Sequence, residues 1–404
     1  MRLHFSQPVD RDTLLQAVDW SPRVPGSWRA EDDEGRIWRF CPDLPAWPRG
    51  TRVQWTVKPP LTERPYSWSF TISPTMVLYL WPPAGQISEI YGQAPPQDQT
   101  LWDHQRLVAS ELGILDFDVH PDGRFLYFSE ANRQGGSNLI RFDLATGERT
   151  VLLACGSALC DRPRVGMSDD GLYLAFEYMP LAGQWSVVVL NLATLRTHDI
   201  SPPKHTAYNP IWSPHGVLAF YDETDQTYRF WHPKRGLWAN VASDRGDDGT
   251  WLRDGSFLFT RYQPVPPGKA YRDDVLAVQM VRFDPRTGVE ESWSDEPLWE
   301  DLAPQADPTG RFLAFIRRGL EPETWTPGRQ IWLRDLIRST QAAITQDETY
   351  THTDLAWSPD GRYLAYVRSS TLSENERPEL WLYDVQTRSH TFLHAGAHHV
   401  RWLP

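Results

Sequence analysis

The chain has 404 residues, more than one small domain contains, and its 52 acidic residues outnumber its 40 Lys and Arg residues, so the formal net charge is −12. This charge, together with the absence of any run of five Lys or Arg residues, argues against a nucleic-acid-binding protein, because phosphate binding requires a basic surface. No run of 18 apolar residues indicates a transmembrane helix, and Met1 is not followed by the charged and then apolar segments of a signal peptide.

The first 73 residues predict a small β-sandwich. Short segments rich in aromatic and β-branched residues are separated there by Pro and Gly clusters, which is typical of sandwich strands. The segments are "RLHFS", "GSWRAED", "RIWRFCP", "TRVQWTVKPP" and "YSWSFTIS". One short helix is expected near residues 12–18, and Cys41 lies in a predicted strand.

From residue 119 onward, one phrase recurs along the chain. Its clearest copy is "WSPDGRYLAYVR" at residues 357–368, in which Pro359 fixes φ, Asp360 can bond its own backbone and Gly361 accepts a positive φ. This pattern predicts a strand, a tight turn and a second strand. A second phrase that ends in a turn, such as "ELWLYDVQTRS", follows each copy, so each repeat predicts the four strands of one propeller blade. The turn glycines are Gly123, Gly171, Gly216, Gly255, Gly310 and Gly361.

The two ends of this repeat array match different parts of one blade. The C-terminal "HHVRWLP" at residues 398–404 matches a first strand, with Trp402 in the place of Trp357. "MVLYLWPP" at residues 76–83 matches a second strand, and "SEIYG" and "QRLVAS" match the third and fourth. The C-terminal strand is therefore expected to complete a seventh blade and to remove the exposed edges of an open ring.

The W-S-P-D-G-x-x-L-A-Y phrase, followed by an I/L-W-x-x-D-x-x-T segment, resembles the repeat of TolB-like propellers, the WD40-like (PD40) family, over residues 75–404. Residues 5–10, 50–51 and 68–71 resemble bacterial Ig-like domains of cell-surface proteins, without the opening strand before Leu3. These resemblances imply an all-β chain with an Ig-like sandwich at 1–73 and a seven-bladed propeller at 74–404. The missing strand leaves two readings, a sequence trimmed from a longer precursor or an incomplete domain.

The spacing of the cysteines is informative about the cellular compartment in which the protein folds. Cys155 and Cys160 flank "GSAL" between two predicted blades and are close enough for a disulfide in an oxidising compartment. The alternative is three free, half-buried thiols. No spacing of Cys and His residues suggests a zinc site.

Standard catalytic motifs are missing from the sequence. TolB-like propellers also occur attached to serine peptidases, but G-x-S-x-G, H-E-x-x-H, the P-loop and G-x-G-x-x-G are all absent. The nearest match to a nucleophile elbow runs from Gly166 to Gly171, and it is the predicted hairpin turn of the second blade.

Aligning the repeats on their turns places a polar residue three positions before the motif tryptophan in six of seven blades. First strands line the channel of a propeller, so these side chains are expected to form a ring near one mouth. Its carboxylates, Asp116, Asp248 and Asp354, could hold a hard cation such as calcium. The alternative is that each side chain bonds the backbone of the neighbouring blade. The aligned residues are Asp116, Arg164, Asn209, Asp248, Ala303, Asp354 and His399.

Long connections between second and third strands form the second candidate. They span residues 263–274, 319–330 and 371–379, and the antiparallel strand order places them on the same face as the polar ring. Loops on rigid scaffolds often carry function. The alternative is that long loops vary freely and expose an occasional aromatic residue. The candidate binding residues are Tyr271, Arg272, Trp325 and Arg329, whose types are enriched at binding hot spots.

Two classes of function remain. Four late histidines, His390, His394, His398 and His399, suggest a metal-dependent lyase, although adjacent strand residues point to opposite faces. The favoured interpretation is a non-enzymatic, extracytoplasmic binding protein of a bacterial cell envelope, either periplasmic, secreted or surface-anchored. Its expected partner is a protein or peptide, with a glycan as the second choice, and no resident cofactor is expected. The alternative is a metal-dependent lyase or a hydrolase that acts on a glycan or peptide.

Overall fold

The computed structural model describes residues 2–32, 34–42, 52–71, 75–83, 85–95, 104–168, 171–272, 274–373 and 376–403. Contacts between residues divide the chain into two compact units, Met1–Thr75 and Met76–Pro404. The residues 50–51 that contribute to the Ig-like resemblance, the side chain of Cys41 and residue Pro404 lie outside the described parts. No helix among the described residues has the length and apolarity that a membrane span requires.

The described residues of the first unit form two three-stranded antiparallel sheets around one core. One sheet has the order β1 (Arg2–His4), β4 (Ile37–Pro42), β3 (Gly26–Ala30), and the other has the order β2 (Val18–Ser21), β5 (Arg52–Val57), β6 (Tyr66–Thr71). Aromatic side chains from both sheets meet in the core: the ring of Trp55 lies 5.8 Å from that of Trp28 and 5.7 Å from that of Phe40. The predicted β-sandwich strands are therefore present, and their aromatic residues form the core.

One short helix, α1 (Arg11–Ala17), precedes β2, close to the predicted range. It begins at Asp10, whose carboxylate accepts a hydrogen bond from the backbone N–H of Thr13 at 2.9 Å. This side chain satisfies one of the N–H groups that the first turn of a helix leaves unpaired. Leu14 and Ala17 are fully buried, so the helix contributes to the core of the first unit.

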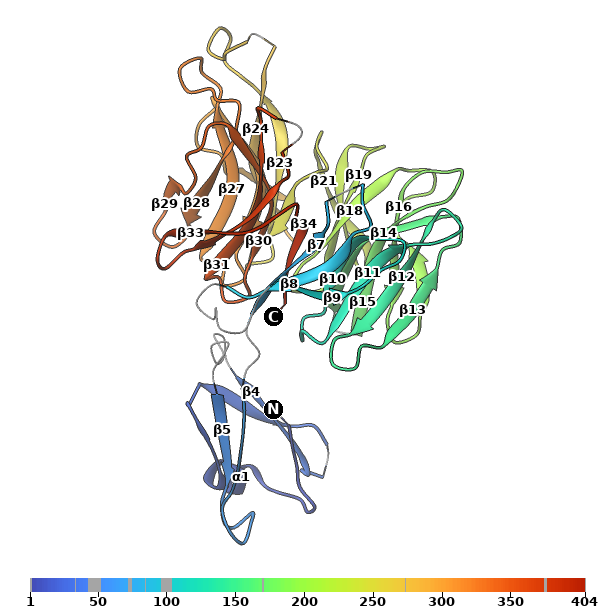
Figure 1. Ribbon diagram of the computed structural model, residues 1–404, viewed down its shortest axis with the longest axis vertical. Helices are drawn as coiled ribbons and strands as arrows, with labels where there is room; N and C mark the ends of the chain where they lie inside the picture. The colour runs from blue at the N-terminus through green and yellow to red at the C-terminus, as the bar shows by residue number, and fades with distance from the viewer. Residues whose placement is uncertain are drawn as a thin grey trace. The chain divides into compact units, whose positions relative to one another are not determined.

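The described residues of the second unit form seven four-stranded antiparallel sheets (Figure 1). The first two are β10 (Ile114–Val119), β11 (Phe125–Ala131), β12 (Ser137–Asp143), β13 (Arg149–Ala154) and β14 (Leu159–Ser168), β15 (Gly171–Met179), β16 (Ser186–Asn191), β17 (Arg196–Asp199). The next two are β18 (Ala207–Trp212), β19 (Leu218–Asp222), β20 (Thr227–His232), β21 (Gly236–Ala242) and β22 (Gly249–Trp251), β23 (Phe257–Pro264), β24 (Leu276–Asp284), β25 (Val289–Ser292).

The remaining sheets include one that joins both ends of the unit. Two follow the chain, β26 (Trp299–Ala306), β27 (Phe312–Gly319), β28 (Gln330–Asp335), β29 (Thr340–Ala343) and β30 (Tyr350–Trp357), β31 (Tyr363–Ser370), β32 (Glu379–Asp384), β33 (Ser389–Ala395). The last has the order β34 (His398–Leu403), β7 (Met76–Trp81), β8 (Glu89–Gln93), β9 (Gln105–Val108). Figure 1 shows red β34 beside blue β7, and Trp402 pairs with Val77 in this ladder.

The first strands of the sheets contact one another in a closed cycle. Neighbours in this cycle are β10 and β14, then β18, β22, β26, β30 and β34, and β34 returns to β10. Sheets that follow one another around a common centre are the arrangement of a β-propeller. The predicted all-β class is therefore confirmed, and the turn glycines adopt the expected backbone: Gly361 has a φ of 68° and Gly123 a φ of 73°.

The motif tryptophans join one sheet to the next. The indole N–H of Trp402 donates to the carbonyl of Ala356 at 2.9 Å, and that of Trp357 donates to the carbonyl of Gln305 at 2.9 Å. Trp212 and Trp251 donate in the same way to the preceding first strand. Because each indole is largely buried and hydrogen-bonded, the repeated tryptophan serves packing between sheets rather than a site.

Candidate functional site

Several residues of the predicted polar ring lie at a β-bulge that recurs in the first strands of the sheets. Pairing with the second strand shifts register at this point, and Asn209, Ala303, Asp354 and His399 have φ values between 47° and 58°. A bulge leaves a backbone N–H without its ladder partner. A carboxylate of the preceding sheet accepts that N–H, as Asp354 does from His399 at 3.1 Å and Asp248 from Ala303 at 3.1 Å. These side chains therefore bond the neighbouring backbone, as the alternative interpretation predicted.

The placement of Arg164 in this ring is wrong. In the second sheet the bulge begins at Arg162, which has a φ of 47°, so Arg162 takes the position that Asn209 has in the third. The reason is a longer hairpin: pairing of β14 with β15 continues as far as Ser168 and Gly171. An alignment that counts residues back from the turn glycine therefore places Arg164, instead of Arg162, at the bulge. Arg164 corresponds instead to Ile211 of the next sheet.

Arg164 nevertheless forms a buried charge cluster with Asp116, which lies on the first strand of the preceding sheet. The carboxylate of Asp116 is 1% exposed and accepts from Arg164 Nη2 at 2.8 Å, while Arg401 and His399 lie 3.8 Å away. Burial by itself would raise the pKa of Asp116, but these three basic groups outweigh it and hold the pKa below the usual range. Asp116 is therefore an ionised carboxylate whose charge is already balanced.

The structure does not bring the three predicted cation ligands together. Among the described residues, the group of three potential metal ligands that does form is His205, Asp222 and Asp225, and not Asp116, Asp248 and Asp354. Arg229 occupies that group, because its Nε donates to Asp222 at 2.6 Å and its Nη2 contacts Asp225. An arginine at this position already balances the two carboxylates, so the group is explained as an ion-pair cluster.

The four late histidines do not form a common site in the described part of the chain. His390 bonds the hydroxyl of Tyr366 at 2.9 Å and donates to the carbonyl of Ile344 at 2.8 Å. The ring of His394 stacks on that of His104 at 4.2 Å, and the rings of His398 and His399 lie 5.1 Å apart. Each is used in a local contact, and that of His398 with His399 lies within the single strand β34. The convergence of histidines that a metal-dependent lyase requires is not among these contacts.

Two of the long loops, however, do meet. Tyr271 lies in the 265–275 loop between β23 and β24, and Trp325 lies in the 320–329 loop between β27 and β28. Their rings are 5.0 Å apart, and the backbone N–H of Tyr271 donates to the carbonyl of Leu320 at 2.7 Å. Trp325 is 37% exposed. The predicted binding residues of two different sheets thus form one partly exposed aromatic surface.

Arg318 lies beside this aromatic pair, and Arg329 shares the carboxylate partner of Arg318. The guanidinium of Arg318 lies 5.7 Å from the Trp325 ring, and Arg318 Nη2 and Arg329 Nε both contact the Glu300 carboxylate, at 2.9 and 2.8 Å. Burial lowers the pKa of Arg318, although Glu300 opposes this effect. Arg318 and Glu300 were not predicted, because they lie at strand ends next to the loops. An arginine directly before a long loop is the signal that could have identified them.

The remaining predicted residue, Arg272, is more exposed. Its Nε pairs with Asp274 at 3.3 Å and its guanidinium lies 5.5 Å from the Tyr271 ring. The surface pair with Asp274 contributes little to stability because both side chains are largely in water. The aromatic surface formed by Tyr271 and Trp325 therefore has the exposed charge of Arg272 beside Tyr271 and the charge of Arg318 beside Trp325.

His352 anchors the backbone under this surface. It is 2% exposed, and its Nδ1 donates to the carbonyl of Arg329 at 2.6 Å. Burial lowers the pKa of His352 to about 4, and burial also lowers that of His398 to about 4. Both imidazoles therefore remain neutral in the folded protein under mildly acidic conditions.

The histidine pKa values predict that the protein loses stability as the pH falls from 6.5 to 4. In this window the unfolded state takes up a proton at His352 and the folded state does not, so the unfolded state is favoured. Between about pH 7 and pH 5, His352 should account for a decrease in the free energy of unfolding on the order of 1–2 kcal/mol. Urea denaturation at both pH values measures this decrease in the free energy of unfolding. His352→Gln should show a smaller decrease than wild type, and exposed His198→Gln serves as the control. A decrease in His352→Gln as large as that in wild type would show that His352 does not cause this pH dependence.

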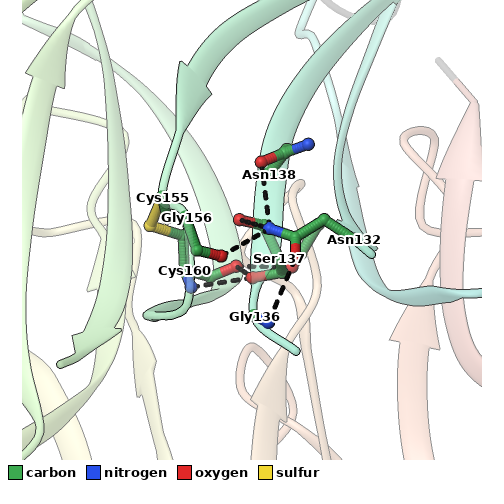
Figure 2. Close-up of a disulfide and its surroundings, with 8 residues drawn as sticks. Asn132, Gly136, Ser137, Asn138, Cys155, Gly156 and Cys160 are labelled. Carbon is green, nitrogen blue, oxygen red and sulfur yellow. Dashed lines mark hydrogen bonds between the residues drawn. A yellow bond between two sulfur atoms is a disulfide. The ribbon is translucent and has the colours of Figure 1, made fainter. Parts of the chain in front are cut away.

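The predicted disulfide is present and joins Cys155, in the connection from β13 to β14, to Cys160 at the start of β14 (Figure 2). Figure 2 shows this loop held against the β11–β12 connection by side-chain hydrogen bonds. The amide of Asn132 donates to the carbonyl of Gly156 at 2.7 Å, and the Ser137 hydroxyl bonds the backbone of Cys160 at 2.7 and 2.8 Å. Cys160 is fully buried, so the bridge stabilises a packed loop and is not an exposed thiol pair.

No protein-family model and no curated protein sequence matches this chain. Among solved structures, the β-propeller domain of the Trilobed protease from Pyrococcus furiosus is 12% identical with a TM-score of 0.52, over 69% of this chain and 82% of that one. A prolyl endopeptidase is 11% identical with a TM-score of 0.50, over 87% of this chain and 49% of that one. TolB from Acinetobacter baumannii is 12% identical with a TM-score of 0.49, over 88% of this chain and 80% of that one. At this identity the similarity to the Trilobed protease domain shows a shared β-propeller fold and leaves activity open.

Proposed function

We propose that this chain is a non-enzymatic binding protein whose partner docks on the aromatic surface formed by Tyr271 and Trp325. The observation that carries the proposal is the contact between these two rings, at 5.0 Å, made by loops of two neighbouring sheets. Tyrosine, tryptophan and arginine are the residues most enriched at binding hot spots, and all three types meet here. A protein or peptide is the partner that such a surface fits best.

The loops that carry this surface are restrained before any partner binds. The 265–275 loop contains two prolines, directly after Pro264 at the end of β23, and the 320–329 loop also contains two. Proline restricts the unbound chain, and the backbone bond from Tyr271 to Leu320 ties the two loops together. Less conformational entropy is then lost when a partner binds, which favours affinity.

We further propose that the seven sheets are the blades of one propeller domain, residues 74–404, that residues 1–73 form an Ig-like domain, and that the protein works outside the cytoplasm of a bacterial cell. The disulfide of Cys155 and Cys160 supports this location, because disulfides persist in oxidising compartments. Mass spectrometry without reduction, on protein from its native host, should find these two cysteines bonded. Free thiols at both positions would contradict the location.

Replacing both aromatic residues should weaken partner binding without unfolding the protein. In Tyr271→Ala/Trp325→Ala we expect a loss on the order of 2 kcal/mol or more of binding free energy, because the variant removes the partly exposed rings that the partner would cover. The partner is first identified by cross-linking and affinity capture from cell envelopes, and the affinity is then measured with purified components by calorimetry.

The matched control is Leu195→Ala/Val289→Ala, which changes two side chains that are 54% and 52% exposed. Both lie at turns between third and fourth strands, at the opposite ends of the strands from the 265–275 and 320–329 loops. It should leave the affinity unchanged. Equal losses from both double variants would show that the face is wrong. Turnover of a glycan or peptide substrate by the purified protein would show that the class of function is wrong.

A further inference from the structure

A cleft of about 670 Å³ lies between the β22–β25 sheet and the β26–β29 sheet, beside the core where the two sheets pack together. This volume lies within the range of small-molecule sites. Its apolar wall is formed by Leu252, Trp293, Ala306 and Leu336, which pack on the buried core between the two sheets. The cleft is lined by hairpin turns near Asp254 and Ser339. These turns lie at the opposite ends of the strands from the loops that carry Tyr271 and Trp325.

The carboxylates that line the cleft are already paired. Each of the three aspartates has an arginine within hydrogen-bonding distance, so none of them calls for a cationic ligand. The pairs are Asp254 with Arg282 at 2.8 Å, Asp295 with Arg317 at 2.8 Å and Asp335 with Arg311 at 3.1 Å.

Two arginines of the same cleft are hydrogen-bonded only to neutral acceptors among the described residues. Arg253 Nη1 donates to the carbonyl of Thr309 at 2.9 Å. Arg334 donates to Gln341 Oε1 at 2.8 and 3.0 Å and to the carbonyl of Trp293 at 2.9 Å. The carboxylate nearest to Arg334, that of Asp295, lies 3.7 Å away and is held by Arg317. Burial lowers the pKa of Arg334, which indicates a cation that is incompletely solvated.

We propose that this cleft binds a small carboxylic acid with an apolar body, the carboxylate on Arg253 and Arg334 and the apolar body on Trp293 and Leu252. Arginine presents paired N–H donors that match a carboxylate, and partial exclusion of water strengthens such bonds. A single negative charge suits the site better than a phosphate dianion, because the three lining aspartates keep their charge although they are paired. This site is separate from the proposed binding surface, so either proposal can fail alone.

The probe is N-acetyl-L-phenylalanine, and its comparison compound is N-acetyl-L-phenylalaninamide, which has the same apolar body and no charge. Calorimetry on the full chain should give a Kd below about 1 mM for the acid. The acid should bind about tenfold or more tightly than the amide, because hydrogen bonds to charged groups exceed those to neutral groups by this amount. Equal binding of acid and amide, or no binding of the acid in this range, would overturn the proposal.

Two variants assign the roles of the residues. Arg253→Gln/Arg334→Gln should reduce the affinity for the acid to that for the amide and leave the amide unaffected, whereas Trp293→Ala should weaken both. Arg286→Gln, whose exposed side chain pairs with Asp284 outside the cleft, is the control and should bind as wild type does. Wild-type affinity for the acid in the double arginine variant would refute the proposal. Circular dichroism establishes that each variant is folded, and if one is not, the acid–amide comparison on wild type still decides.

Discussion

Replacing Trp402 with alanine is expected to reduce the free energy of unfolding by about 3–5 kcal/mol. Trp402 is 7% exposed, stacks on Tyr363 with ring centres 6.2 Å apart, and donates its indole N–H to Ala356. The substitution therefore removes a large buried aromatic side chain and a hydrogen bond that joins β34 to β30. Chemical denaturation with purified protein measures the loss.

The control for Trp402→Ala is Phe392→Ala, in the neighbouring sheet. Phe392 is 48% exposed, so its loss should cost less than about 1 kcal/mol. A truncation after Ala397 tests the closure itself. Without β34, the edge of β7 loses its partner and the cycle of first strands opens between β30 and β10, so thermal unfolding should begin at a markedly lower temperature. A truncated chain with the melting curve of wild type would disprove the role of β34.

Replacing Asp301 with alanine should reduce the free energy of unfolding by about 3 kcal/mol, because it leaves the charge of Arg317 buried with too few partners. The Asp301 side chain is fully buried and that of Arg317 is 3% exposed. Their contacts are Nε to Oδ1 at 2.6 Å and Nη2 to Oδ2 at 3.0 Å. The guanidinium lies among the rings of Trp299, Phe315 and Trp332, at 5.4, 5.0 and 5.1 Å.

A double variant that removes both charges distinguishes the effect of the ion pair from a simple loss of packing. Asp301→Leu/Arg317→Met removes both charges and should be more stable than Asp301→Ala, because no uncompensated charge then remains in the core. The control is Glu111→Ala, which breaks an ion pair with Arg133 whose side chains are 87% and 82% exposed, and it should change stability by less than about 0.5 kcal/mol. If the double variant is as unstable as Asp301→Ala, charge is not the cause.

The strands and turns were predictable because their signals extend over only a few residues. A turn such as Ser358–Gly361 requires a glycine with positive φ, and the sequence supplies one between the first and second strands of each repeat. The pairing of β34 with β7 was predictable too, because the two ends of the array are complementary fragments of one repeat. Tyr271 and Trp325 could be selected by residue type and by their positions in long loops.

What the sequence alone determined was therefore the all-β class, the repeat and the loops that carry Tyr271 and Trp325, whereas the tertiary structure decided the contacts between sheets. The register of Arg164 depends on how far β14 and β15 continue to pair, and the partner of Asp354 is a backbone N–H freed by a bulge at residue 399. Arg253 and Arg334 line one cleft only because two sheets pack side by side. The physical reason is range: turn and strand preferences act through neighbouring residues, whereas the bond from His399 to Asp354 and the shared cleft of Arg253 and Arg334 bring together residues about 45 and 80 positions apart, whose geometry no local pattern specifies.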